Sequence, residues 1–308
     1  MKTLKKRHLS QKLERYFSRV ENWVEHNWRL KYQTLGNSRF SNYLTLSVVL
    51  GLIPLICVLV FFLPVDIQES LMVNVTILNP LTFVTSVFVH GGFEHLAGNG
   101  SVYFLVASLA YCINRKSGHE RFFLYSFLAV LFVSPLLYYP ILFLLNFWVF
   151  HFTFVSFGLS LVVASLIGLL IPSLIIFLNE GLELKINPQR FLLSIICLTG
   201  VLMLLPYLKL EFYNLTVLFA LMILGSYIGR SELSRISQFI ANTKKEKRAK
   251  NGAIATISIL VVYAACVALL FPTTIVQASG SIVDIFAHYF GVFFGLLVPY
   301  YLIPKRAR

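Results

Sequence analysis

Hydrophobic runs about as long as a membrane span recur along this chain and leave few other folds open to it. Of its 308 residues, 57% are hydrophobic and only 13% are charged, whereas a soluble domain carries about 25% charged residues. A helix needs about 20 apolar residues to cross a ~30 Å hydrocarbon core. The stretches that meet this requirement are 44–64, 95–113, 121–140, 155–178, 191–209, 212–229, 252–271 and 283–303. We therefore expect an all-α, polytopic membrane helix bundle with about eight spans.

The basic residues are distributed in a way that orients this bundle. The net charge is +13. If the amino terminus is cytoplasmic and the chain crosses the membrane at every run, all Lys and Arg residues except Lys209 lie on the cytoplasmic side. This bias is the positive-inside pattern of multi-pass membrane proteins. It predicts a protein of the cell membrane with both termini in the cytoplasm. Anionic lipid headgroups are the expected partner of the basic clusters, and the lack of basic aromatic patches argues against nucleic acid.

This topology divides the chain into three parts. Residues 1–43 form a basic juxtamembrane segment, 44–303 the transmembrane domain, and 304–308 a basic cytoplasmic tail. The inner loop 230–250 combines apolar residues at helical spacing with a basic run, which predicts an amphipathic helix lying in the membrane plane. The outer connection 141–154 is too hydrophobic for a water-exposed loop, so we expect it to enter the interface or pack on the bundle.

Two polar residues lie about one turn inside spans that start from the outer side. They are Ser160 in the fourth span and His288 in the last. Gly291 and Gly295 share a helix face with His288, so the Ser160 helix could approach closely there. A histidine within hydrogen-bond reach of a serine can act as its general base. Taken alone, Ser160 is better explained by a hydrogen bond within or between helices than by catalysis, and His288 is explained equally well by such a bond.

A second polar pair lies at the outer end of the second span. His95 and Asn99 are four residues apart and therefore share a face. Their N–H groups could stabilise the oxyanion that serine hydrolysis generates, although a polar contact between helices would explain them as well. His90, in the turn before them, favours a structural hydrogen bond. Asp284, one turn outward of His288, could orient the ring, but its place at the end of the span favours contact with water.

Together these stretches resemble the rhomboid family of intramembrane serine proteases. The similar segments are Pro80–Asn99, which carries the HxxxxHxxxN core of the family's first loop and second helix; Gly158–Gly168, which resembles the GxSG nucleophile helix; and Ala287–Gly295, which resembles the HxxGxxxG base helix. The resemblance implies a six-helix core, here with an extra helix pair. It implies a dyad of Ser160 and His288 without a third acid, and His95 and Asn99 at the oxyanion. Transmembrane protein substrates would enter laterally and be cut near their outer boundary, with no cofactor.

The chain departs from the family pattern in three places. Leu161 stands where the family usually has glycine, which supports an alternative: a catalytically impaired rhomboid-like protein that binds membrane clients. The Trp-Arg pair often found in the first outer loop is absent between residues 65 and 89. Three spans, instead of one, separate the serine and histidine helices, so the gate-like helix is either 191–209 or 252–271. Substrate identity and oligomeric state are left open.

A metal site is the third possibility that the residues raise. His90, His95, His151 and His288 are all expected near the outer surface, and imidazoles bind zinc and copper. However, the HxxxxH spacing lacks the carboxylate of HExxH, and no ligand set exists on the inner side. The four cysteines form no CxxC pair and are typical of small apolar residues in spans. We therefore expect no metal.

Overall fold

The structure is a computed structural model that describes residues 47–151, 155–207, 212–241, 247–271 and 284–304. The basic segment expected at 1–43, and residues 305–308 of the tail, lie outside this part of the chain. The α-helices are α3 (Ile53–Phe61), α4 (Val65–Leu71), α5 (Pro80–Thr85), α6 (Phe93–Lys116), α7 (Glu120–Leu128), α8 (Ser134–Leu145), α9 (Ser160–Ile176), α10 (Pro188–Leu204), α11 (Phe212–Ala241), α12 (Lys247–Leu270) and α13 (Ile285–Leu302). The strands are β1 (Val73–Asn74) and β2 (Val155–Ser156). Wider π-helical turns cover Ser47–Leu52, Ala129–Val133, Asn146–Phe150 and Phe177–Gly181, and short 3-10 turns cover Ser86–Phe88 and Leu205–Tyr207.

Six helical segments in the described residues are long and apolar enough to cross a membrane. They are Phe93–Lys116, Glu120–Val149, Ser160–Gly181, Leu215–Ala241, Ala249–Leu270 and Ile285–Leu302. The chain is therefore an all-α, multi-pass bundle embedded in a membrane. The two remaining runs expected as spans, 44–64 and 191–209, overlap the shorter apolar helices Ser47–Phe61 and Pro188–Leu204.

Two segments expected as connections are largely helical. The helix expected to end at residue 140 continues through Pro140 to Leu145, and a π-helical turn carries it to Phe150. Residues 230–241 continue α11 instead of forming a separate in-plane helix, and α12 begins at Lys247. The reason is local: residues 230–241 contain neither glycine nor proline, the residues that most readily end a helix.

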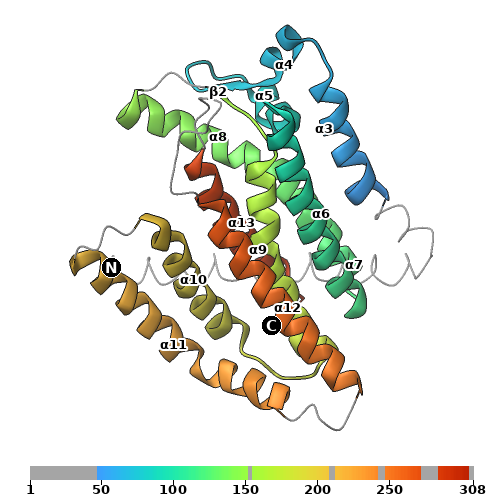
Figure 1. The fold of residues 1–308 in the computed structure, drawn as a ribbon, viewed down its shortest axis with the longest axis vertical. Coiled ribbons are helices and arrows are strands. Elements are labelled where there is room, and N and C mark those ends of the chain that lie inside the picture. Colours follow the sequence, from blue (N-terminus) through green and yellow to red (C-terminus); the bar gives the residue numbers. More distant parts are fainter. Residues whose placement is uncertain (1–46, 152–154, 208–211, 242–246, 272–283, 305–308) are drawn as a thin grey trace, which may run out of the picture. The chain divides into compact units, whose positions relative to one another are not determined.

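The core of the bundle is α9. Its most apolar stretch is completely buried, whereas the other candidate spans are buried over half of that stretch at most. α6, α8, α12 and α13 all pack against it, and α9 lies between α6 and α13 (Figure 1). A helix that is apolar around its whole circumference belongs in such a position. Ser160, the first residue of α9, therefore stands at the head of the most enclosed helix.

Contacts between the connection that precedes α6 and the connection that precedes α9 fix the chain just before Ser160. β1 pairs antiparallel with β2, with Val73 opposite Ser156. Two residues after β2, the amide of Gly158 donates to the carbonyl of Ser86 at 2.9 Å. Because both contacts join segments far apart in sequence, they hold the approach to α9 in place.

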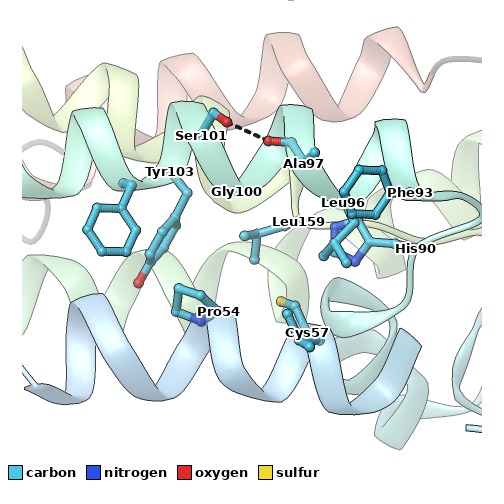
Figure 2. A pocket seen from close by; sticks show the side chains of 12 residues that line it. Pro54, Cys57, His90, Phe93, Leu96, Ala97, Gly100, Ser101, Tyr103 and Leu159 are labelled. Atoms are coloured by element: carbon cyan, nitrogen blue, oxygen red, sulfur yellow. Dashed lines mark hydrogen bonds between the residues drawn. The ribbon is translucent and has the colours of Figure 1, made fainter. Parts of the chain in front are cut away.

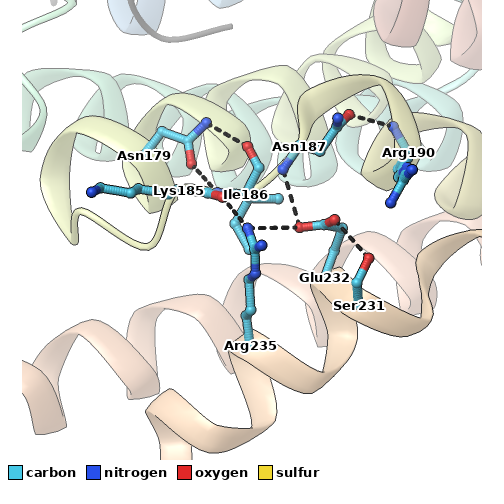
Figure 3. A network of polar contacts seen from close by, with 8 residues as sticks. All are labelled: Asn179, Lys185, Ile186, Asn187, Arg190, Ser231, Glu232 and Arg235. Atoms are coloured by element: carbon cyan, nitrogen blue, oxygen red, sulfur yellow. Dashed lines mark hydrogen bonds and ion pairs between the residues drawn. The ribbon is translucent and has the colours of Figure 1, made fainter.

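A buried carboxylate binds the connection between α9 and α10 to α11 (Figure 3). Glu232 is 1% exposed, accepts a hydrogen bond from the amide of Asn187 at 3.0 Å, and lies 3.7 Å from the guanidinium of Arg235. Arg235 also donates to the carbonyl of Lys185. A buried carboxylate needs such partners, so this network sets where α11 packs against the start of α10.

Candidate active site

α9 and α13 approach each other through glycines at distances that no other residue would allow. A Cβ built on Gly291 would lie 2.7 Å from the carbonyl oxygen of Leu161, and one on Gly295 would lie 1.9 Å from that of Ser165. From the other side, a Cβ on Gly168 would lie 2.3 Å from the carbonyl oxygen of Val292. The backbones are therefore in direct contact, as small residues at helix interfaces in membranes permit.

The register of this contact brings His288 to the level of Ser160. The two helices run in the same direction, because Gly291 faces Leu161 and Ser165, whereas Gly295 faces Ser165 and Gly168. His288 lies about one turn before Gly291 on α13. Ser160 lies about one turn before the midpoint of the α9 segment that faces Gly291. Ser160 and His288 therefore lie at the same end of the segment over which α9 and α13 are in close contact.

The ring of His288 is held by the end of α12. It is 7% exposed, and its Nδ1 lies 2.6 Å from the carbonyl oxygen of Leu270. A carbonyl only accepts, so Nδ1 carries the proton and Nε2 of the neutral ring carries a lone pair. This tautomer is the one a general base uses. Within the described residues, no hydrogen bond joins Nε2 to the hydroxyl of Ser160.

His95 and Asn99 pack against the backbone that leads into Ser160. A Cβ built on Gly158 would lie 2.9 Å from Cε1 of His95 and 3.8 Å from Nδ2 of Asn99. Gly158 also has φ +111°, in a region that L side chains rarely adopt. Position 158 therefore requires glycine both for its conformation and for the approach of the His95 ring.

One buried hydrogen-bond donor without a partner in the described structure lies near the start of α9, where the first backbone amides also have no helical partners. Nδ2 of Asn99 is buried and has no hydrogen-bond partner in the described structure. No side chain caps α9, and its first intrahelical bond runs from the amide of Val163 to the carbonyl of Leu159. The amide of Ser160 precedes that bond and has no partner within the helix. A buried donor without a partner is costly, and donors aimed at a reacting carbonyl are what an oxyanion requires.

His90 makes a structural contact and also leaves one nitrogen unused. Its Nδ1 lies 3.2 Å from the carbonyl oxygen of Phe88, and its ring centroid lies 5.1 Å from that of His95. Nε2 is buried without a partner in the described structure. Burial, with the neighbouring His95, lowers the pKa of His90 to about 4, so the ring is neutral at physiological pH.

Asp284 does more than meet water at the end of its span. Its Oδ1 accepts hydrogen bonds from the amide of Ala287 at 3.1 Å and from the hydroxyl of Tyr138 at 2.7 Å, and its Oδ2 accepts one from Ser156 at 3.0 Å. The carboxylate thus caps α13 and binds its start to α8 and β2. The sequence carried half of this signal, because an Asp directly before an apolar run is a typical N-cap. No feature of the sequence identified Tyr138, Ser156 or the carbonyl of Leu270 as partners of the candidate site.

The side chain of Leu161 is taken up by packing. It is 1% exposed and belongs to a hydrophobic cluster whose other buried members are Val73, Val75, Phe83, Tyr138, Tyr139, Leu142 and Ala287. These residues come from β1 and the turn after it, and from α5, α8 and α13. Leu161 therefore helps to join β1, α5 and α8 to the two helices of the candidate site.

The described residues contain no group of three or more His, Cys, Asp or Glu side chains placed to hold a metal ion. Cys57, Cys112, Cys197 and Cys266 are all free thiols. Comparisons of the chain with known protein families, with curated proteins and with solved structures gave no match. The candidate site is therefore interpreted from its own geometry.

Proposed function

We propose that this chain is a rhomboid-like intramembrane serine protease in which Ser160 and His288 form the catalytic dyad. The observation that carries the proposal is the register of the glycine contact between α9 and α13. It places Ser160, the first residue of the buried helix α9, at the same height along the helix pair as the imidazole of His288, which the carbonyl of Leu270 anchors. A serine and a histidine that come within hydrogen-bond reach of each other can perform nucleophilic catalysis of acyl transfer.

In the proposed reaction, Oγ of Ser160 attacks the scissile carbonyl while Nε2 of His288 takes its proton. The carbonyl of Leu270 keeps the ring in the required tautomer throughout. When the tetrahedral intermediate collapses, the imidazolium gives the proton to the leaving amine. Water then attacks the acyl-enzyme by the same route in reverse, which releases Ser160.

Asn99 is the proposed principal oxyanion donor, assisted by His95 and by the amide of Ser160. Among the described residues, Nδ2 of Asn99 is a buried donor without a partner, so the developing negative charge would satisfy it without prior rearrangement. A single donor of this kind contributes about 3 kcal/mol to transition-state stabilisation. His90, Gly158, Gly291 and Gly295 are proposed to act structurally, by shaping the approach of these groups.

The packing of Leu161 favours a protease over the alternative of a rhomboid-like protein that binds membrane clients without cutting them. That alternative rests on the leucine that replaces the family's usual glycine. Its side chain is accommodated in the cluster beneath β1, so the replacement has a structural role that leaves Ser160 and His288 in place.

We further propose that transmembrane protein substrates reach the site from the lipid and are cut near their outer boundary, with both termini of the enzyme in the cytoplasm. Of the two candidates for the gate-like helix, α12 is favoured over α10, because its last residue, Leu270, binds His288 directly. Anionic lipids are the proposed partners of the cytoplasmic basic clusters.

Labelling with a fluorophosphonate tests the dyad directly. The full-length chain in lipid vesicles is expected to react, because an activated serine attacks the probe, and Ser160→Ala and His288→Ala are expected to abolish the reaction. Ser126→Ala is the matched control, since the Ser126 hydroxyl is buried without a partner in the described structure. Labelling that survives both site substitutions would show that the dyad is misassigned. Labelling of Ser160 without cleavage of any reporter transmembrane substrate would favour the client-binding alternative.

A further inference from the structure

A cavity of about 470 Å³ lies between α3 and α6, with Leu159 as a further lining residue (Figure 2). Its volume falls within the ~300–1,000 Å³ typical of small-molecule sites. The lining comes from α3, from the turn before α6 and from one face of α6. Neither Ser160 nor His288 contributes to it.

The cavity wall is mostly apolar, and each of the two apolar helices adds an exposed side chain to it. Val58 of α3 and Phe104 of α6 line it and are both exposed. α6 is one of the candidate spans and α3 is a shorter apolar helix. The exposed side of the cavity therefore lies where lipid acyl chains lie, and a chain entering it would meet a mostly apolar wall.

The mostly apolar wall of the cavity includes one buried polar atom that lacks a partner in the described structure. His90 lines the cavity, is 1% exposed, and has a buried Nε2 without a partner in the described structure. Figure 2 shows its ring beside Phe93 and Leu96, at the other end of the cavity from Tyr103. A buried polar atom that is left unpaired is costly, so this nitrogen marks the place where a ligand's polar end would gain most.

The chemistry of this nitrogen restricts the ligand. Nδ1 of His90 lies 3.2 Å from the carbonyl oxygen of Phe88, so Nδ1 carries the proton and Nε2 can only accept. Burial holds the pKa of His90 at about 4, which keeps the ring neutral at physiological pH. The ligand must therefore donate a hydrogen bond. An ester or a carboxylate anion cannot, whereas a hydroxyl can.

We propose that this cavity binds a single-chain lipid whose hydroxyl group donates a hydrogen bond to Nε2 of His90 while its acyl chain lies between α3 and α6. A monoacylglycerol has this chemistry. The inference rests on the cavity and on His90 alone, and it holds whether or not the chain is a protease.

Photo-crosslinking in vesicles tests the proposal. The full-length chain is reconstituted in phosphatidylcholine vesicles that contain a monoacylglycerol with a diazirine in its acyl chain, and crosslinked peptides are mapped by mass spectrometry. Crosslinks are expected in α3 and α6. Excess monoacylglycerol is expected to compete about tenfold better than the methyl ester of the same fatty acid, because only the former satisfies His90. Equal competition by the two lipids would overturn the hydrogen-bond assignment.

Two glycines of α6 provide a matched pair of variants. Gly100 lines the cavity and Gly98 does not, and a Cβ at either position meets nothing within 4 Å. Gly100→Leu is expected to fill the cavity and reduce crosslinking about tenfold, whereas Gly98→Leu leaves it unchanged. His90→Phe keeps a ring of similar shape and is expected to remove the preference for monoacylglycerol over the methyl ester. The proposal would be refuted if Gly100→Leu left the crosslinking unchanged. It would also be refuted if no crosslinks formed in α3 and α6 because another part of the chain fills the cavity.

Discussion

The contact between Gly295 and Ser165 offers the sharpest test of how helix packing supports the candidate site. Substituting Gly295 by alanine adds a Cβ that would lie 1.9 Å from the carbonyl oxygen of Ser165 and 3.0 Å from Cα of Gly168. An ordinary contact between carbon and a carbonyl oxygen is about 3.3–3.6 Å. The helices must therefore separate locally by more than about 1 Å, because both clashing atoms belong to the backbone and cannot rotate away.

The expected cost has a structural and a catalytic part. Overpacking a dense interior costs about 1–3 kcal/mol, and a clash with backbone belongs at the upper end. Separation of α13 from α9 would also carry His288 away from Ser160, and a displacement of about 1 Å at reacting groups can lower the rate about 100-fold. We therefore expect Gly295→Ala to lose most of its fluorophosphonate reactivity and to unfold at a lower temperature.

Two measurements separate these parts. Thermal unfolding in detergent, followed with a thiol-reactive dye, reports the structural cost, and the rate of fluorophosphonate labelling reports the catalytic cost. Gly98→Ala is the control, since a Cβ at this position meets nothing within 4 Å. Replacing a glycine inside a helix by alanine is expected to stabilise the fold by about 0.5–1 kcal/mol. If Gly295→Ala unfolded and reacted like the parent chain, the close contact between α9 and α13, and with it the proposed register, would be wrong.

Two further predictions concern Asp284 and His90. Asp284→Ala removes the acceptor of the Tyr138 hydroxyl and the cap of α13, so a loss of about 1–3 kcal/mol in unfolding free energy is expected; Tyr138→Phe should reproduce only part of it, and no loss in either variant would contradict the network. Because burial lowers the pKa of His90 from 6.5 to about 4, the unfolded chain binds a proton first as the pH falls. Stability is then complete above about pH 6.5 and decreases towards pH 4, by about 3 kcal/mol from this residue. His90→Phe should flatten the melting temperature over that range, and an unchanged slope would exclude His90 as its source.

Local spacing was sufficient to select the polar residues of the candidate site. His95 and Asn99 share a face because a helix turns every 3.6 residues, and the same rule aligned His288 with Gly291 and Gly295. The break expected at residue 230 is absent, because apolar periodicity with a basic run describes the end of a long helix as well as a separate one. Asp284 could be recognised as a cap, but its partners Tyr138 and Ser156 lie more than a hundred residues away in sequence.

The sequence by itself determined that this chain is a multi-pass helical bundle, since about 20 consecutive apolar residues have no other stable environment than hydrocarbon. It also determined which polar residues share a helix face. Only the tertiary structure decided that α9 is the buried centre, that Leu161 packs against β1, and that a cavity lies between α3 and α6, with a His90 nitrogen that has no partner among the described residues. The physical reason is that a residue's helix face follows from its near neighbours. The register between two helices depends on backbone contacts, such as that of Gly295 with Ser165, which join residues 130 positions apart.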